Sequence, residues 1–190
     1  MKENSHICIR DKESLREYIY ADIQVNFGES FGLWKRLNNN KFKLLFFLRV
    51  THYYIHQSKK TPWKRLLQSL SHSFYKYYQQ KFCIDIKPKT CIGKGLHLPH
   101  PVGIVIHGKA AIGDFCTILQ QVTIGNKSEQ NINDVATIAD NVYLGAGAKI
   151  LGKCKIGNYA KIGANAVVLR DVNAYAVATG VPANIRNIDR

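Results

Sequence analysis

The chain has 190 residues, 46% of them hydrophobic, and carries a formal net charge of +14. This length accommodates one or two small domains, and the hydrophobic content is ordinary for a globular protein. No apolar run approaches the roughly 18 residues that a membrane-crossing helix requires, and residues 1–13 lack the apolar segment of a signal peptide.

Positive charge is concentrated in residues 35–81, which contain eleven Lys or Arg and no Asp or Glu. Five tyrosines lie among them: Tyr53, Tyr54, Tyr75, Tyr77 and Tyr78. A basic and aromatic segment of this kind suits a membrane surface or an anionic glycan, and a solvated helical face is the alternative interpretation. Nucleic acid is not an expected partner, because no recognised binding motif is present.

The first part of the chain, residues 14–82, has helical periodicity. Ser14–Glu17 has the pattern of a capping box and predicts a helix over residues 15–25. Apolar residues at helical spacing predict a second helix over residues 41–56.

A third predicted helix begins at Pro62, a residue favoured in the first turn, and reaches Phe82. Its expected apolar stripe consists of Leu66, Leu67, Leu70, Phe74 and Tyr78. Residues 28–40 and 57–61 are expected to be connecting loops.

From Asp85 onward the sequence repeats every six residues. Aliphatic residues recur at this spacing in one unbroken run: Ile138, Leu144, Ile150, Ile156, Ile162 and Val168. Two positions before each is a small or β-branched residue: Ala136, Val142, Ala148, Cys154, Ala160 and Ala166. A period of six fits neither a helix nor an alternating strand, and it predicts a β-solenoid in which each hexapeptide forms one side of a coil.

Two insertions interrupt the repeat. Ile106 follows Leu98 after eight positions, and Ile138 follows Ile124 after fourteen. Insertions in a solenoid leave the core and become surface loops. The first insertion contains His100 between two prolines, so we expect this imidazole to be held outside the core.

The five cysteines have neither the spacing of a metal site nor that of a disulfide framework. Cys116 and Cys154 occupy small-residue positions of the repeat and are expected to be buried. The sequence therefore predicts a cytoplasmic location, with a peripheral position at the inner face of the membrane as a further option.

Several segments together resemble the hexapeptide-repeat acyltransferases and, within them, the serine acetyltransferases. They are residues 85–88, 92–100, 103–106, 119–125, 144–152, 160–164 and 180–183. The resemblance implies a left-handed parallel β-helix with an N-terminal α-helical region. The predicted organisation is a helical region over residues 1–82, a β-helix acetyltransferase domain over residues 83–170 and a tail over residues 171–190.

In that family the histidine that matches His100 is the general base, and the aspartate that matches Asp85 orients it. An alcohol must lose its proton as it attacks a thioester, and a neutral imidazole is a suitable acceptor near pH 7. A carboxylate on the other ring nitrogen fixes the tautomer and stabilises the imidazolium. Because the two residues are fifteen positions apart and a coil has about eighteen residues, we expect Asp85 roughly one layer from His100.

The resemblance also implies acetyl-CoA as co-substrate, bound in a groove between coils of two subunits of a homotrimer. The residues that match its expected contacts are Gly125, Gly145, Ala146, Lys161 and Ala164. No metal is expected, because no acidic or cysteine ligand clusters in sequence with His97, His100 and His107.

Two features depart from the serine acetyltransferases. Pro99 replaces the aspartate that usually precedes the catalytic histidine, and the loop over residues 126–134 lacks the usual Arg-His pair. The short helical region, with residues 15–22 and 43–49, resembles instead the serine acetyltransferase homologues of bacterial capsule and exopolysaccharide gene clusters. That resemblance implies an acetyl-CoA-dependent O-acetyltransferase that acts on a sugar hydroxyl of a capsular or other surface polysaccharide. Serine O-acetylation for cysteine biosynthesis is the alternative, and a non-catalytic β-solenoid scaffold is a second one.

Overall fold

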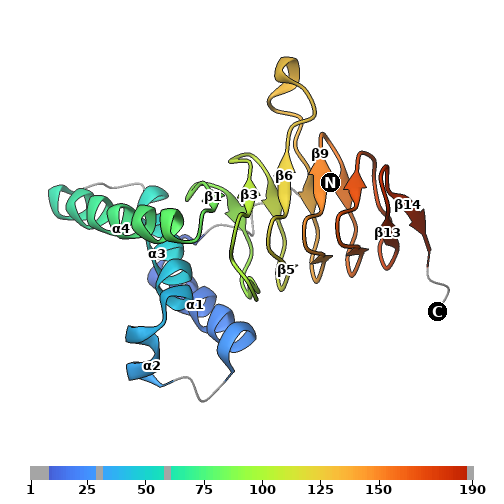
Figure 1. Ribbon diagram of the computed structural model, residues 1–190. Coiled ribbons are helices and arrows are strands. Elements are labelled where there is room, and N and C mark those ends of the chain that lie inside the picture. Colours follow the sequence, from blue (N-terminus) through green and yellow to red (C-terminus); the bar gives the residue numbers. More distant parts are fainter. Residues whose placement is uncertain (1–8, 29–31, 58–60, 188–190) are drawn as a thin grey trace.

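The structure is a computed structural model that describes residues 9–28, 32–57 and 61–187. The first eight residues of the polar N-terminal segment lie outside this description. A group of helices lies at one end of an elongated solenoid of short strands (Figure 1). Among the described residues, no helix is both long and apolar enough to cross a membrane.

The helical region contains four helices within the described residues: α1 (Lys12–Phe27), α2 (Leu33–Asn38), α3 (Asn40–Ile55) and α4 (Pro62–Lys81). The three predicted helices are present, but the predicted cap of the first was wrong. Asp11 is the N-cap of α1, and Ser14 is the third helical residue that closes the capping box. Residues 28–40 also contain the short helix α2, which lacks a side-chain cap and is missed by capping patterns.

Helix α4 begins as predicted, with Thr61 as N-cap and Pro62 in the first turn. Its predicted apolar stripe is buried only in part, at Tyr78. The face of α4 buried against the rest of the protein carries Ser71, Tyr75 and Tyr78, whereas Leu66, Leu70 and Phe74 remain about half exposed. Tyr75 is fully buried, and its hydroxyl donates a 2.7 Å hydrogen bond to the carbonyl of Ile86 in the solenoid.

The solenoid is built from three parallel sheets, one for each side of the coil. The first sheet contains β1 (Asp85–Ile86), β3 (Val105–Ile106), β6 (Thr123–Gly125), β9 (Lys149–Leu151) and β12 (Val167–Val168). The second contains β2 (Cys91–Ile92), β4 (Ala111–Ile112), β7 (Thr137–Ile138) and β10 (Lys155–Ile156). The third contains β5 (Thr117–Ile118), β8 (Tyr143–Leu144), β11 (Lys161–Ile162) and β13 (Val177–Thr179), to which β14 (Asn184–Arg186) pairs antiparallel.

The aliphatic residue of each hexapeptide fills the interior, as the period predicts. Ile138, Leu144, Ile150, Ile156, Ile162 and Val168 are at most 1% exposed. They stack on equivalent residues of neighbouring coils, as Ile124 does on Ile106 and Ile150. Cys116 and Cys154 are buried in the same core, and burial raises the pKa of the Cys116 thiol to about 12.

Both insertions form surface loops. The first is the turn that contains His100. The second projects from the solenoid and includes a short 3-10 helix over Glu129–Asn131 (Figure 1). The tail adds β13 and β14 to the far end of the third sheet.

Candidate active site

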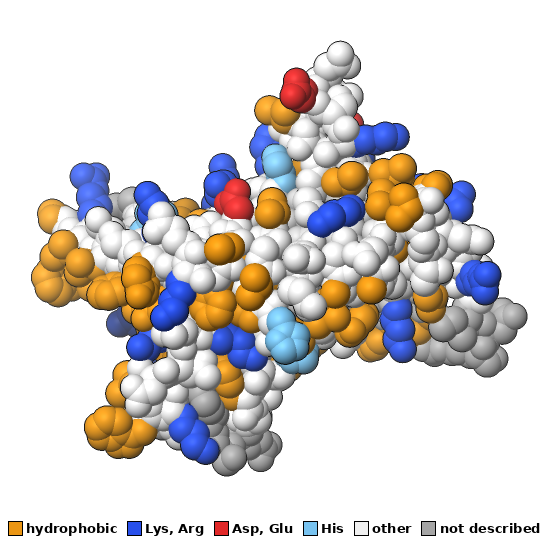
Figure 2. All heavy atoms as spheres, in the orientation of Figure 1, with side chains coloured by type: hydrophobic (Ala, Val, Ile, Leu, Met, Phe, Trp, Pro, Cys, Tyr) orange, Lys and Arg blue, Asp and Glu red, His pale blue; other side chains and the backbone are white. Residues whose placement is uncertain are grey.

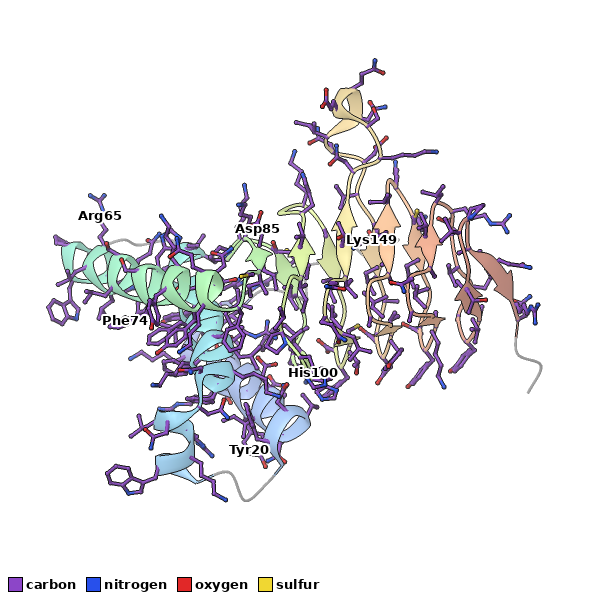
Figure 3. All side chains as sticks on the ribbon, in the orientation of Figure 1. Tyr20, Arg65, Phe74, Asp85, His100 and Lys149 are labelled. Atoms are coloured by element: carbon purple, nitrogen blue, oxygen red, sulfur yellow. The ribbon has the colours of Figure 1, made fainter. Side chains whose placement is uncertain are left out.

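His100 lies in a turn whose backbone is fixed on both sides. Leu98, two residues before it, is buried in the core, and the Val102 amide donates to the His100 carbonyl over 2.8 Å. Gly103 then reverses the chain with φ of 66°, a conformation that favours glycine. The imidazole itself is exposed, as expected, and lies at the corner between the third and first sheets (Figure 3).

Helix α1 fixes the segment that leads into this turn. The side chain of Asn26 accepts a hydrogen bond from the Leu98 amide (3.1 Å) and donates one to the Leu96 carbonyl (2.8 Å). Asp22 accepts a 2.9 Å hydrogen bond from the Leu96 amide. The backbone two to four residues before His100 is therefore bonded to α1 at three points.

Arg49 of α3 completes this contact. Its guanidinium donates to both carboxylate oxygens of Asp22, at 2.8 and 3.0 Å, and to the carbonyls of Ile92 and Gly93, at 2.7 and 2.6 Å. Both side chains are at most 4% exposed. Burial raises the pKa of the Asp22 carboxyl, and the Arg49 charge opposes that rise. We call Asp22, Asn26 and Arg49 the junction cluster.

Sequence reasoning assigned no role to the junction cluster. Asp22 of α1 and Arg49 of α3 are charged residues on the buried sides of their helices. Because buried charges in folded proteins are paired, these positions were the available signal for an ion pair. Pairing partners across α1 and α3 cannot be read from periodicity alone.

The corner that carries His100 also carries three of the five residues expected to contact acetyl-CoA: Gly145, Ala146 and Ala164. Backbone hydrogen bonds join successive coils along it, from Gln121 N to Val102 O (2.9 Å), Gly147 N to Gln120 O (2.9 Å) and Asn165 N to Ala146 O (2.8 Å). Val102, Gln120, Ala146 and Ala164 thus occupy one row along the solenoid, and the Val102 amide donates to the His100 carbonyl beside it. We call this row together with His100 the corner row.

The three residues at this corner that are expected to contact acetyl-CoA differ in exposure. Ala164 is exposed and Ala146 is half-buried, whereas Gly145 is buried. A Cβ atom on Gly145 would come within 2.7 Å of the Ala164 nitrogen and the Ile162 oxygen. Gly145 is therefore required for the close approach of two coils, and Ala146 and Ala164 present the accessible small surface. Lys161 is exposed on β11, the strand just before Ala164.

Asp85 and Gly125 lie elsewhere, on the first sheet. Asp85 forms a 2.9 Å ion pair with Lys87 and accepts a 3.3 Å hydrogen bond from Gln79 of α4. Both Asp85 and Gly125 line an open hollow of about 510 Å³ between the first sheet and the projecting loop. His107 lines the same hollow; the sequence analysis considered this residue only as a metal ligand.

Within one chain the structure does not bring Asp85 and His100 together. Figure 3 shows Asp85 on the upper side of the solenoid and His100 at its lower edge. The first insertion lengthens this coil, so the residue stacked on Asp85 is Val105, five positions after His100. The expectation that Asp85 lies one layer from His100 does not hold inside a single chain.

The three histidines considered for a metal do not form a site. His97 has its Nδ1 atom 3.3 Å from the Thr117 hydroxyl, and burial lowers the pKa of its imidazole. Among the described residues, no three His, Cys, Asp or Glu side chains are grouped so that they could hold a metal ion.

Comparison with known proteins identifies the repeat. Residues 136–170 match the family described as bacterial transferase hexapeptide (six repeats). A serine acetyltransferase of Haemophilus influenzae is 39% identical over 142 residues, which cover 75% of this chain and 50% of the relative. One from Synechococcus elongatus is 37% identical over 76% of this chain and 56% of the relative. The chain thus spans about half the length of these relatives.

Solved structures agree with the sequence matches. A serine acetyltransferase in complex with CoA has a TM-score of 0.71 and 35% identity, covering 92% of this chain and 71% of the other. Soybean serine acetyltransferase complexed with serine has a TM-score of 0.73 and 32% identity, covering 92% and 70%. The prediction of a left-handed parallel β-helix preceded by helices is confirmed, and the chain belongs to the serine acetyltransferase family of hexapeptide-repeat proteins.

Proposed function

We propose that this protein is an acetyl-CoA-dependent O-acetyltransferase in which His100 is the general base. The observation that carries the proposal is the position of His100: an exposed imidazole on a fixed turn, beside a row that includes the small residues Ala146 and Ala164. The family supports acetyl-CoA as the co-substrate, since one solved relative is a complex with CoA.

In the proposed reaction, His100 takes the proton of the acceptor hydroxyl as its oxygen attacks the thioester carbonyl. The tetrahedral intermediate then expels the CoA sulfur, and the imidazolium returns the proton to it, so that no covalent enzyme intermediate is needed. The products are the acetyl ester and free CoA. Backbone amides near the thioester would stabilise the oxyanion.

The corner row is the proposed path of the pantetheine arm. Ala146 and Ala164 leave room for a chain that passes close to the backbone, and Lys161 offers a cation near the nucleotide end. Gly145 supports this path indirectly, through the close packing of two coils. Gly125 lies in the hollow over the first sheet, so we place it near the acceptor instead.

We propose that Asp85 supports the His100 of a neighbouring subunit in a homotrimer. The separation of the two residues inside one chain motivates this assignment. A subunit boundary would bring the corner row of one copy against the first-sheet hollow of the next, because cyclic assemblies join two different surfaces. The scaffold alternative remains the competing interpretation if these two residues do not meet across subunits.

Mixed trimers test the shared site. Asp85→Asn and His100→Ala chains should each be nearly inactive alone, and co-expression should restore part of the activity by forming sites with both native residues. No recovery in mixed trimers would contradict pairing between subunits. A monomeric mass by light scattering would also contradict it.

The relatives favour L-serine as the acceptor, the alternative of the sequence analysis. The matched proteins are serine acetyltransferases, and one was solved with serine bound. The cations that line the hollow, Lys87, Lys89 and Lys109, suit an acceptor with a carboxylate.

A saccharide hydroxyl is the second candidate, favoured by two local observations. Pro99 supplies no carboxylate for the ammonium group of serine, and the loop over residues 126–134 has no Arg or His for its carboxylate. Each unpaired buried group would cost about 1–3 kcal/mol. The hollow of about 510 Å³ is within the roughly 300–1,000 Å³ of small-molecule sites.

The rate of CoA thiol release tests both the role of His100 and the identity of the acceptor. His100→Ala should lower the turnover number roughly 100-fold or more, whereas His72→Ala, at an exposed position of α4, should leave it unchanged. Near wild-type turnover in His100→Ala would overturn the assignment. Specificity constants for L-serine, hexoses, uronic acids and capsule oligosaccharides then rank the acceptors.

A further inference from the structure

The helical region exposes an apolar surface that the proposed transferase site does not use. Along α4 the exposed residues are Trp63 (67%), Leu66 (46%), Leu70 (48%), Phe74 (51%) and Tyr77 (57%). They recur every three or four positions and therefore form one stripe. On α2, Trp34 is 80% exposed and Leu37 is 53% exposed.

This stripe borders the buried face of α4, and its member Phe74 also stacks on Phe47 of α3, with ring centroids 4.9 Å apart. The buried residues of α4 are Ser71, Tyr75 and Tyr78, and Figure 3 shows Phe74 and Arg65 on opposite sides of the helix. In Figure 2 apolar side chains gather over this end of the molecule. We call Trp34, Leu37 and the five exposed residues of α4 the apolar face.

The apolar face is hollowed in two places. A hollow of about 500 Å³ lies between α2, α3 and α4, and one of about 450 Å³ lies along α4. Phe74 and Tyr78 line both. Arg36 and Lys43 line the first, so cationic groups border aromatic walls.

The surrounding charge has a single sign. Residues 35–81 contain eleven Lys or Arg and no Asp or Glu, and only Arg49 among the described ones is buried. Two copies of this surface brought face to face would repel each other, because their charges are alike. A neutral partner would gain no electrostatic attraction from these Lys and Arg side chains. Charge complementarity therefore favours an anionic partner.

We propose that the apolar face binds the surface of a membrane that contains anionic lipids. Trp, Leu, Phe and Tyr would enter the interface between head groups and acyl chains, and the Lys and Arg side chains would contact the lipid phosphates. Amphipathic helices that lie in this interface have the same combination of an aromatic face and a basic rim. The proposal is independent of the acceptor and of the catalytic residues.

The chain provides its own reporters, because its two tryptophans, Trp34 and Trp63, both belong to the apolar face. The full-length protein is titrated with vesicles of phosphatidylglycerol and phosphatidylcholine, and with vesicles of phosphatidylcholine alone. Anionic vesicles should shift the tryptophan emission to shorter wavelength and sediment the protein, and high salt should weaken both effects. The variants Trp34→Phe and Trp63→Phe assign the shift to each helix.

Two variants test the two contributions separately. The double variant Leu66→Gln with Leu70→Gln changes only half-exposed positions and should weaken vesicle binding at least tenfold. The double variant Arg36→Gln with Lys43→Gln, at the cations that border the first hollow, should weaken it roughly 30-fold. The matched control is Tyr159→Asn, which removes an exposed aromatic ring from the solenoid at a φ of 60° that asparagine tolerates.

Three results would overturn the proposal. The first is the absence of an emission shift with anionic vesicles. The second is a concentration-dependent shift without vesicles together with a doubled mass, which would assign the face to a second copy of the protein. The third is an equal shift with a soluble anionic polysaccharide, which would assign it to a polymer instead.

Discussion

The helical region and the solenoid are stabilised in different ways. In the solenoid the same aliphatic contact and the same backbone hydrogen bonds recur in each coil, and its interior contains aliphatic and small residues. The junction of the helices with the first coil instead depends on single polar contacts: Arg49 with Asp22, His52 with Pro88 and Tyr75 with Ile86. Substitutions at the junction should therefore have large and individual effects, whereas those in the coils should have moderate and similar ones.

The largest effect is expected for Arg49→Leu. This change leaves the Asp22 carboxylate without its cation in a buried site, and it removes the donors to the Ile92 and Gly93 carbonyls. Removing one partner of a buried ion pair costs about 3–5 kcal/mol. Denaturant titration followed by tryptophan emission measures the loss, because both tryptophans are in the helical region. The control Arg170→Leu, at an exposed position, should change stability by at most about 0.5 kcal/mol.

The second effect is a loss of stability in acid. Burial, together with the nearby His56, lowers the pKa of His52 from 6.5 to about 4. Its Nδ1 atom is 2.8 Å from the Pro88 carbonyl, and its buried Nε2 atom has no hydrogen-bond partner among the described residues. The folded state therefore holds the neutral ring, with the proton on Nδ1.

The sign of the change in stability with pH follows from the protonation of His52 in the folded and unfolded states. Below pH 6.5 the unfolded chain binds a proton at this position that the folded chain does not, so stability falls as the pH falls from about 6.5 to 4. The full loss is about 3 kcal/mol, since one pKa unit corresponds to 1.36 kcal/mol. In His52→Gln the fall in unfolding free energy between pH 7 and pH 4 should be smaller by this amount. A slope equal to that of the native protein, or an equal change in the control His72→Gln, would contradict the prediction.

The third effect connects the junction to the proposed chemistry. Asn26→Ala removes the hydrogen bonds to the Leu96 carbonyl and the Leu98 amide, two residues before His100. We expect a loss of about 1–2 kcal/mol of stability and a several-fold lower turnover number with a nearly unchanged KM for acetyl-CoA. Asn26→Asp keeps the acceptor for the Leu98 amide and should rescue part of the turnover. Equal losses in turnover and acetyl-CoA binding would indicate a general structural defect.

The contrast between the two regions also explains what the sequence could predict. The solenoid was predictable because each aliphatic residue has the same neighbours in the next coil, so the period itself gives the core. The two insertions were located for the same reason, since each adds residues to a fixed count. Family resemblance then supplied His100, which the structure places at the exposed turn.

The remaining features depend on contacts between distant segments. Spacing predicted the apolar stripe of α4, but periodicity identifies an apolar face without showing what packs against it. The Asp22 and Arg49 pair joins residues 27 positions apart, and no local pattern encodes it. The separation of Asp85 from His100 arises because one insertion moves the residue stacked on Asp85 to Val105.

The smallest effects are expected inside the coils, where repetition makes a quantitative prediction possible. Ile150 of the first sheet and Ile138 of the second are at most 1% exposed, and each stacks between aliphatic residues of two neighbouring coils. Removal of one buried methylene by Ile→Val costs about 0.5–1.5 kcal/mol. Because the two environments are nearly the same, Ile150→Val and Ile138→Val should cost the same within about 0.5 kcal/mol. Denaturant titration followed by far-ultraviolet circular dichroism measures both, and costs that differ by more than about 1 kcal/mol would show that the coils are not equivalent.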